Sequence, residues 1–263
     1  MLLGRLYEQH VQERPTEETI ETLSGEISYI KNLLIHPDEF EQHPFLTPKL
    51  KEIYLSYAGA KEQYGLYDFD DMLLIAYKAL KQYPDLLEQM RRRYSVIQVD
   101  EAQDNSKVQN SIIRLLVTDQ TSLLMVADDD QMIYEWRGAH PDGVLKFDTF
   151  YPGAEVFKME ENFRSSQEIV NLSNAFIKSN QNRYDKQIVT HNPSFKPVQL
   201  VKVRNEMEQI QDVIKRIKGS PSGYHEHAIL YRNNMTAVLF ANALVQSGIP
   251  FQLRGSTPYF FNH

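Results

Sequence analysis

The stretch that decides the fold is VIQVDEAQD, residues 96–104, in which a short apolar run gives way to a cluster of carboxylates. Val96–Val99 is predicted to be a buried strand, so Asp100 and Glu101 follow at its carboxyl end. Open α/β sheets place ligands at that end of their strands. Two adjacent carboxylates can divide the work there. Asp100 can hold Mg²⁺ directly or through water, and Glu101 can orient or deprotonate an attacking water.

A purely structural alternative exists for the same residues. The strand would simply end, and Asp104 or Asn105 would cap a helix over residues 108–116. The complete DEAQD string favours a site over a plain turn, because Gln103 and Asp104 have little to do in a plain turn.

Composition sets the outer bounds. The 263 residues suffice for one large domain or two smaller ones, and 42% hydrophobic with 24% charged residues is ordinary for a globular protein. Cysteine is absent, which excludes disulfides and thiolate metal sites and fits a cytoplasmic location. The opening residues turn polar too early for a signal peptide, and no apolar run reaches membrane-spanning length. A net charge of -7 argues against a broadly basic nucleic-acid surface, although a local channel could still be positive.

The rest of the chain has two textures. Residues 1–64 carry apolar side chains at helical spacing, which predicts helices that start at Thr16 and Thr47 with a threonine cap. Gly65 ends this pattern and Asp68 opens another helix. Short apolar runs then alternate with helical segments, which predicts right-handed crossovers and a largely parallel sheet. The predicted strands are Val96–Val99, Ser122–Ala127, Glu155–Met159, Val198–Val203, Ala228–Tyr231 and Phe251–Arg254.

A second polar stretch, MVADDDQMIYEWRGAH, covers residues 125–140. It puts three aspartates at a strand end, where mutual repulsion and lost hydration require a compensating partner. Tyr134, Trp136 and Arg137 suit base stacking on single-stranded nucleic acid. The alternative is that the two aromatic residues belong to a core or an interface.

A third stretch, MEENFRSSQEI, covers residues 159–169 and again follows a predicted strand. Its Arg164 would ordinarily be a surface ion-pair residue. Ser165 or Ser166, with Glu168 nearby, is a candidate helix cap.

The three stretches together resemble the superfamily 1 DNA helicases of the UvrD, Rep and PcrA type. VDEAQD resembles that family's Walker B segment, ADDDQMIYEWRGA its third motif and MEENFRSS its fourth. YGLYDFDDMLLIAYKAL, AILYRNN and the closing SGIPFQLRGSTPYFF fit as well, in the right order and with similar spacing from about Leu46 to the C-terminus.

The resemblance implies an α/β fold with RecA-like parallel sheets, that is, two partial P-loop NTPase motor domains preceded by a helical segment. Residues 1–65 would be the tail of the insertion in the first motor domain. Residues 66–153 would be the second half of that domain with Walker B, and residues 154–263 the first half of the second. The seam would lie at the turn signal Tyr151–Gly153.

The resemblance also implies a nucleotide site. Asp100 would hold Mg²⁺, and Glu101, beside it in the metal site, would activate the water that attacks the γ-phosphate of ATP. Gln103 would be among the nucleotide-binding residues. Gln131 would sense the γ-phosphate and connect it to the DNA-contacting residues downstream. Arg164 would reach the γ-phosphate from the second motor domain and compensate charge in the transition state.

Single-stranded DNA would run past the third motif. Tyr134, Trp136 and Arg137 would line its track, with Trp136 stacking on a base. Phe163 stands where the family usually has a tyrosine that stacks on adenine, and a phenyl ring can keep that contact. Glu135 replaces a small residue and places a carboxylate beside the proposed track, which puts contact there in doubt.

Several family elements do not occur in the sequence. None of the 11 glycines is followed by lysine, so the phosphate-binding loop G-x-x-x-x-G-K-[ST] is absent, as are the late threonine–histidine and arginine motifs. The chain is therefore predicted to be the middle of a helicase, inactive alone, with ATP and Mg²⁺ bound only in the intact parent and the missing helicase portions as partners. The P-loop strand is expected beside the Walker B strand. Its absence would expose a sheet edge, which invites self-association or a covering helix.

Two other functional classes are open. The chain could be a nucleotide-free helicase remnant that acts as a DNA- or protein-interaction module. It could also be a two-metal nuclease that uses DEAQD together with the three aspartates. The nuclease reading is disfavoured, because the sequence contains no Asp/Glu-x-Lys triplet of the common nuclease core.

Overall fold

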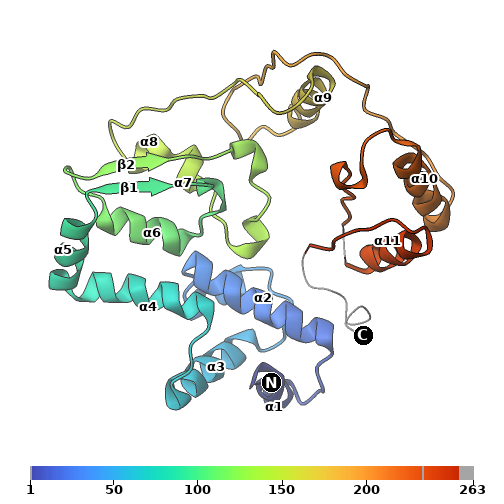
Figure 1. Cartoon of the computed structure of the whole chain (residues 1–263). Helices are drawn as coiled ribbons and strands as arrows, with labels where there is room; N and C mark the ends of the chain where they lie inside the picture. Colours follow the sequence, from blue (N-terminus) through green and yellow to red (C-terminus); the bar gives the residue numbers. More distant parts are fainter. Residues whose placement is uncertain (1, 233, 255–263) are drawn as a thin grey trace. The chain divides into compact units, whose positions relative to one another are not determined.

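The computed structural model describes residues 2–232 and 234–254, and the chain divides into two compact units, Met1–Phe195 and Lys196–His263. A compact unit can hold segments of two domains, so the predicted domain boundaries stay predictions. The helices of the first unit are α1 (Leu2–Val11), α2 (Glu17–Leu33), α3 (Leu50–Tyr64), α4 (Phe69–Gln82), α5 (Pro84–Arg93), α6 (Lys107–Leu116), α7 (Asp142–Leu145), α8 (Phe147–Phe150) and α9 (Gln167–Ile177) (Figure 1). The second unit contains α10 (Glu206–Gly219) and α11 (Asn234–Gln246).

Several helix boundaries follow from the predicted local signals. Thr16 caps α2, its side chain accepting the backbone N–H of Thr19 at 3.1 Å. Asp68 opens α4 in a reciprocal arrangement with Asp71, in which each side chain accepts the other's backbone N–H. Gly65 ends α3 with a φ of +63°, a left-handed conformation that glycine adopts without a steric cost.

The predicted cap at Thr47 is wrong. The backbone N–H of Thr47 donates to the Glu26 carboxylate at 3.2 Å, which ties the residue to α2 instead of to a new helix. α3 begins later, at Leu50, after Lys49, which has a φ of +55° and no side-chain cap.

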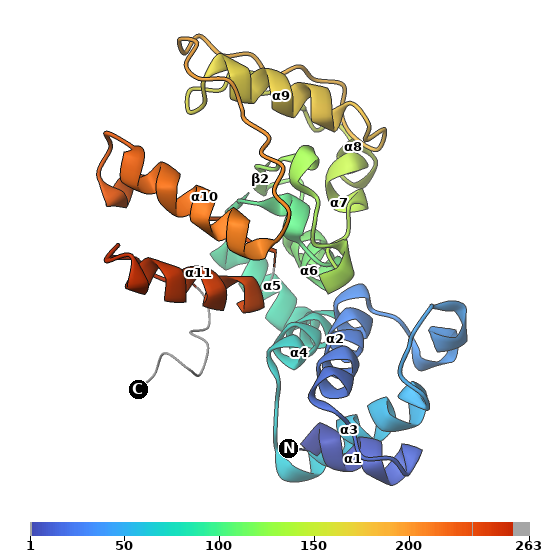
Figure 2. The same cartoon turned by 90° about the vertical axis from the view of Figure 1, so that its right-hand side faces the viewer.

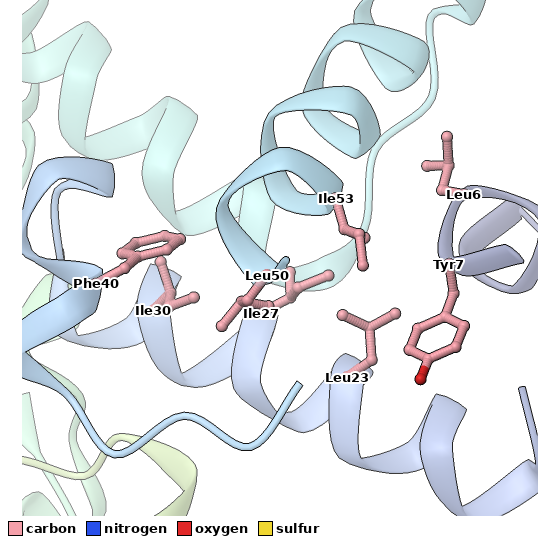
Figure 3. Close-up of a cluster of buried hydrophobic side chains, with 8 residues drawn as sticks. All are labelled: Leu6, Tyr7, Leu23, Ile27, Ile30, Phe40, Leu50 and Ile53. Carbon is pink, nitrogen blue, oxygen red and sulfur yellow. The ribbon is translucent and has the colours of Figure 1, made fainter. Parts of the chain in front are cut away.

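The largest hydrophobic core lies among α1, α2 and α3, which pack together in both views of Figures 1 and 2. α2 supplies Leu23, Ile27 and Ile30 from one face, at the helical spacing that the sequence predicts. Figure 3 shows the complete cluster: Leu6, Tyr7, Leu23, Ile27, Ile30, Phe40, Leu50 and Ile53. Full burial of such a side chain contributes roughly 1.5–3 kcal/mol, so this layer is a stable support for the elements that rest on α2.

The sheet consists of two parallel strands in the described part of the chain, β1 (Val96–Val99) and β2 (Ser122–Met125). Their register pairs Val96 with Ser122 and Val99 with Met125, so both strands end at one edge. α6 makes the crossover between them and contacts α4, which lies on its other side in Figure 1. The predicted strand–helix–strand unit is confirmed here, with β2 two residues shorter than expected. The prediction that Val96–Val99 is buried is wrong, because Val96 is 58% exposed and no residue of β1 is buried.

Four other predicted strands are wrong as paired elements. Among the described residues no ladder forms over Glu155–Met159, Val198–Val203, Ala228–Tyr231 or Phe251–Arg254. A strand is held by hydrogen bonds to a neighbouring strand, and these segments have the composition of strands without such a neighbour. Their apolar side chains are consequently exposed: Phe157 is 82% exposed and Met159 is 84% exposed.

The second unit has a small core of its own, in which Ile217 of α10 and Leu244 of α11 are buried together with Ile249. The end of the closing SGIPFQLRGSTPYFF motif, residues 255–261, lies outside the described residues. No helix within the described ranges is both long and apolar enough to cross a membrane.

A cluster of four charged side chains joins α2 and α3 to the start of α4. Lys31 lies 2.8 Å from Asp71, and Lys61 lies 2.8 Å from Asp68. Lys31 also contacts Asp68, and Lys61 contacts Asp71. The two lysines are almost completely buried, at 4% and 7% side-chain exposure. Tyr57 closes the cluster, because the Lys61 ammonium lies 4.3 Å from the centre of its ring.

Burial and ion pairing act in opposite directions on these carboxyl groups. Burial alone would raise the pKa of Asp68 and Asp71, but hydrogen bonds from Lys31 and Lys61 outweigh it and lower both. Because the pKa in the folded state lies below that in the unfolded chain, the cluster stabilises the fold fully above the ordinary carboxyl value of 3.8. That stabilisation is lost as the pH falls below this value.

Asp68→Asn should therefore destabilise the first unit by about 2–3 kcal/mol. This is less than the roughly 3–5 kcal/mol for breaking a fully buried pair, because the Asp68 side chain is 29% exposed. Chemical denaturation at pH 7 and at pH 3 measures the effect, and the variant should lose less stability than the wild type between the two. Asp38→Asn is the matched control, since Asp38 pairs with Lys51 at the surface, and it should change little. Equal losses in the two variants would contradict the assignment.

Candidate functional site

The first carboxylate pair lies at the end of β1. Asp100 and Glu101 directly follow Val99, and both side chains are exposed. Glu101 has a φ of +50°, and its backbone N–H donates to the Asp100 carboxylate at 3.0 Å. The next residue, Ala102, is buried and its N–H donates to the carbonyl of Val126 at 2.9 Å, beyond the end of β2. This bond fixes the carboxylate pair beside the second strand.

Gln103 connects the two strand ends. Its side chain is buried at 2% exposure, and its Nε2 donates to Glu101 Oε2 at 2.6 Å. Its Oε1 accepts the backbone N–H of Asp128 at 3.0 Å. The sequence argument that this glutamine has more to do than fill a turn is therefore supported by its contacts.

The structural alternative for the same stretch is wrong in its details. Neither Asp104 nor Asn105 caps α6. Ser106 does so, its hydroxyl accepting the N–H of Gln109 at 3.3 Å while the Gln109 side chain returns to the Ser106 N–H at 2.8 Å. Asp104 instead ends a short 3₁₀ turn whose first residue is Ala102.

The three aspartates after β2 are compensated by cations from a distant segment. Lys186 lies 2.9 Å from Asp128 and also contacts Asp129. Arg183 binds Asp130 with two hydrogen bonds, of 2.6 and 2.9 Å. Burial alone would raise the pKa of Asp128, but hydrogen bonds from Gln131 and then Lys186 lower it.

Sequence reasoning required a compensating partner but did not find it. Arg183 and Lys186 lie in the stretch NRYDK, more than 50 residues after the aspartates. The only signal is the presence of two basic residues in a segment that the motifs leave unassigned. A cation at that separation cannot be matched to a carboxylate from the sequence alone.

Gln131 extends the network toward solvent. Its side chain is exposed and its Nε2 donates to Asp128 Oδ2 at 2.7 Å. Asp100, Glu101, Gln103, Asp128 and Gln131 are thus brought together at one edge of the sheet. This places five polar side chains where open α/β sheets bind ligands.

The aromatic residues of the second stretch form an exposed turn. Trp136 is 66% exposed and Tyr134 is 37% exposed, so the alternative of core residues is wrong for Trp136. The Arg137 guanidinium lies 4.6 Å from the Trp136 ring centre and 5.4 Å from that of Tyr134. Glu135 is exposed on the same turn.

The turn is supported from below by α2. Gly138 ends it with a φ of +89°, and a Cβ at this position would lie 2.7 Å from Cβ of Asn32. Asn32 is itself held by hydrogen bonds from its Nδ2 to the Ser28 carbonyl and to Asp70, of 3.0 and 2.9 Å. Only glycine fits at position 138, so the helical layer sets the position of the aromatic turn.

The third stretch lies on a separate turn after residue 160. Asn162 shapes it, because its side-chain oxygen accepts the backbone N–H groups of Arg164 and Ser165 at 3.0 and 2.7 Å. Phe163 is 77% exposed and Arg164 is also exposed. In the described residues no bond connects either side chain to Glu101 or Gln131.

The predicted serine cap is only partly right. Ser166 is the residue before α9, but its side chain makes no capping hydrogen bond. The Glu168 carboxylate accepts the Ser194 hydroxyl and the N–H of Phe195, the latter at 3.0 Å. The Ser194 bond is the main reason that the pKa of Glu168 falls to about 2.

The donor set speaks against a two-metal centre. Within residues 2–232 and 234–254, no three His, Cys, Asp or Glu side chains are grouped as metal ligands. The positions beside Asp128–Asp130 are already taken by Arg183 and Lys186. A single Mg²⁺ held mainly by phosphate oxygens and water needs less from the protein, and the exposed carboxylate of Asp100 fits that role.

Comparison with known proteins agrees with these motifs. The chain is 35% identical to DNA helicase II of Escherichia coli (strain K12) over 213 residues, which are 80% of this chain and 30% of that protein. It is 32% identical to ATP-dependent DNA helicase PcrA of Staphylococcus epidermidis (strain ATCC 35984) over 241 residues, 90% of this chain and 33% of that protein. The chain thus spans about a third of the length of these relatives.

Family models cover the chain in two parts. The UvrD/REP helicase N-terminal domain matches residues 2–152, which is more than half of the chain. The UvrD-like helicase C-terminal domain matches residues 157–263. The chain therefore belongs to the UvrD/REP helicase family.

Proposed function

We propose that the chain is the central part of an ATP-dependent DNA helicase, in which ATP hydrolysis drives movement on single-stranded DNA. The observation that carries the proposal is the buried Gln103, which links Glu101 at the end of β1 to Asp128 and so to Gln131 after β2. A hydrolytic carboxylate and a phosphate-sensing glutamine in such a site must respond to one nucleotide, and this bridge couples them. The relatives named DNA helicase II and ATP-dependent DNA helicase PcrA support the same activity.

In this proposal Asp100 holds Mg²⁺, which when bound neutralises phosphate charge. Glu101 orients the attacking water, with its carboxylate steadied by the hydrogen bond from Gln103. Gln131 contacts the γ-phosphate from its exposed position. Phe163 and Arg164, both exposed on one turn, supply an aromatic surface for adenine and a cation for the phosphates.

Single-stranded DNA is proposed to bind at the exposed turn. Trp136 offers an open ring face for a base, and Arg137 brings a positive charge to the same place. Tyr134 flanks the pair. An overall charge of -7 does not oppose this, because stacking and a local cation act at short range.

We further propose two incomplete RecA-like motor domains with the boundaries 1–65, 66–153 and 154–263 given above, because the two family models meet near the proposed boundary at residue 153. Each strand has one edge without a partner strand among the described residues: the edge of β1, where the P-loop strand was expected, and the edge of β2, where a cavity of about 430 Å³ is lined by β2 and the extended segment 155–159. Leu124 and Phe157 expose apolar surface beside it. Such an edge would be completed by a strand from another helicase segment or covered by self-association.

A second candidate is an interaction module that binds DNA without nucleotide. The exposed turn of Trp136 favours it, because that turn is formed and supported by α2 independently of any phosphate-binding loop. The two candidates predict the same DNA contact and differ in hydrolysis.

The isolated chain should show no ATP hydrolysis above background, with or without single-stranded DNA. Affinity for triphosphate in such sites comes largely from the backbone amides and the lysine of a phosphate-binding loop, a motif that this sequence lacks. Phosphate release is the measurement, with Glu101→Gln as the control. Turnover that disappears in Glu101→Gln would show that the chain contains a working site by itself.

Trp136→Ala should weaken binding to labelled oligo-dT about ten-fold or more, because stacking of one base contributes roughly 1–3 kcal/mol. Fluorescence anisotropy at low salt measures the affinity. Phe176→Ala is the matched control, since Phe176 is 78% exposed on α9 and is not among the residues proposed for the track, so its loss should leave the affinity unchanged. Equal weakening by both substitutions, or by neither, would remove Trp136 from the track.

Glu135→Gln should tighten oligo-dT binding by about two- to three-fold, because an exposed carboxylate beside the phosphate backbone repels it weakly in water. Arg137→Ala should weaken binding and flatten its dependence on salt concentration. Titrations at several salt concentrations distinguish the two effects. A Glu135→Gln affinity equal to that of the wild type at every salt concentration would place this residue away from the DNA.

A further inference from the structure

The segment Arg183–Lys186 binds all three aspartates of the loop after β2, Asp128–Asp130. Arg183 binds Asp130 through two hydrogen bonds, of 2.6 and 2.9 Å. The backbone N–H of Tyr184 donates to Asp129 at 2.7 Å, and Lys186 contacts Asp128 and Asp129. The Tyr184 hydroxyl in turn donates to the carbonyl of Val144 at 2.8 Å, which anchors the segment to α7.

Most of these contacts are protected from solvent, whereas the side chain of Asp128 is 40% exposed. The side chains of Arg183 and Lys186 are each 12% exposed, that of Asp129 is 5% exposed and that of Asp130 is 16% exposed. Charge-assisted hydrogen bonds in such surroundings are stronger than surface ion pairs, and the two-bond arginine contact also fixes an orientation. The segment therefore constrains the geometry of the loop as well as its charge.

Asp128 is the junction through which this constraint reaches the site. Lys186 binds its Oδ1 at 2.9 Å, and Gln131 donates to its Oδ2 at 2.7 Å. Its backbone N–H donates to Gln103 at 3.0 Å, and Gln103 holds Glu101 at 2.6 Å. One chain of hydrogen bonds thus runs from Lys186 to both side chains that are proposed to face the nucleotide.

We propose that Arg183 and Lys186 are positioning residues that set the orientation of Gln131 and, through Asp128 and Gln103, of Glu101. The significance of this role rests on the proposed function, whereas the positioning itself is a property of the loop. Neither cation belongs to the three motifs that identify the family. Removal of Lys186 would leave adjacent carboxylates facing one another, so the loop would open and Gln131 would lose its fixed acceptor.

Hydrogen exchange of the whole chain, followed by mass spectrometry, tests the positioning directly. In Lys186→Met, which keeps the length of the side chain without its charge, exchange should become about ten-fold faster at residues 101–104 and 128–131. Exchange in α2 and α3 should stay as in the wild type. Lys146→Met is the matched control, because Lys146 pairs with Asp142 at the surface of the same unit, and it should change neither region.

Arg183 provides the independent arm. Arg183→Met should loosen the same two regions, and Arg183→Lys should do so less, because it keeps the charge and loses the two-bond contact. The exchanged pair Asp130→Arg with Arg183→Asp should restore much of the protection. These variants decide the question if Lys186→Met does not fold.

Two results would overturn the proposal: unchanged exchange at residues 101–104 and 128–131 in these variants, or equal acceleration throughout the first unit. The second result would mean that the cations only add stability. Oligo-dT binding by the wild type tests the proposed function separately. If the wild type fails to bind while the local exchange pattern is as expected, the DNA role is lost and the positioning role stands.

Discussion

The proposed nucleotide site depends on two parallel strands ending at the same edge of the sheet. The ladder pairs Val99 with Met125, and just beyond it the N–H of Ala102 donates to the carbonyl of Val126. α6 supplies the crossover that a parallel pair requires. Without this register the two acidic stretches would be unrelated turns, and the bridge made by Gln103 could not form.

Clustered carboxylates repel one another and lose hydration when the chain folds. The fold compensates this cost in the same way at two places, in the helical layer and at the strand ends. In the helical layer Lys31 pairs with Asp68, which lies 37 residues further along the chain. At the strand ends Lys186 pairs with Asp128, which lies 58 residues earlier in the chain. In both places the neutralising cation is brought in by tertiary structure and is largely shielded from water. Folding takes these carboxylates out of water, so the folded chain depends on the two lysines to compensate their charge.

Local signals in the sequence predicted local structure well. The caps at Thr16 and Asp68 and the bounds of the strand Val96–Val99 depend on a few neighbouring residues, and each was found as predicted, although the strand is not buried. Features completed by distant partners were missed. Lys186 could not be assigned to its aspartates, and segments such as 155–159 have strand composition without the neighbour that would make them strands. The roles given to the site residues and the domain boundaries remain predictions.

Helix α2 packs against two different parts of the first unit, the hydrophobic core and the aromatic turn. Leu23, Ile27 and Ile30 face the core of the helical layer, whereas Asn32 meets Gly138 beneath the aromatic turn. Each residue turns a helix by about 100°, so one residue inserted or deleted between Leu23 and Asn32 would put the two surfaces out of phase. Relatives that keep both contacts can vary the length of α2 only outside this stretch, because its length sets the rotation and the distance between the core contact and the turn contact.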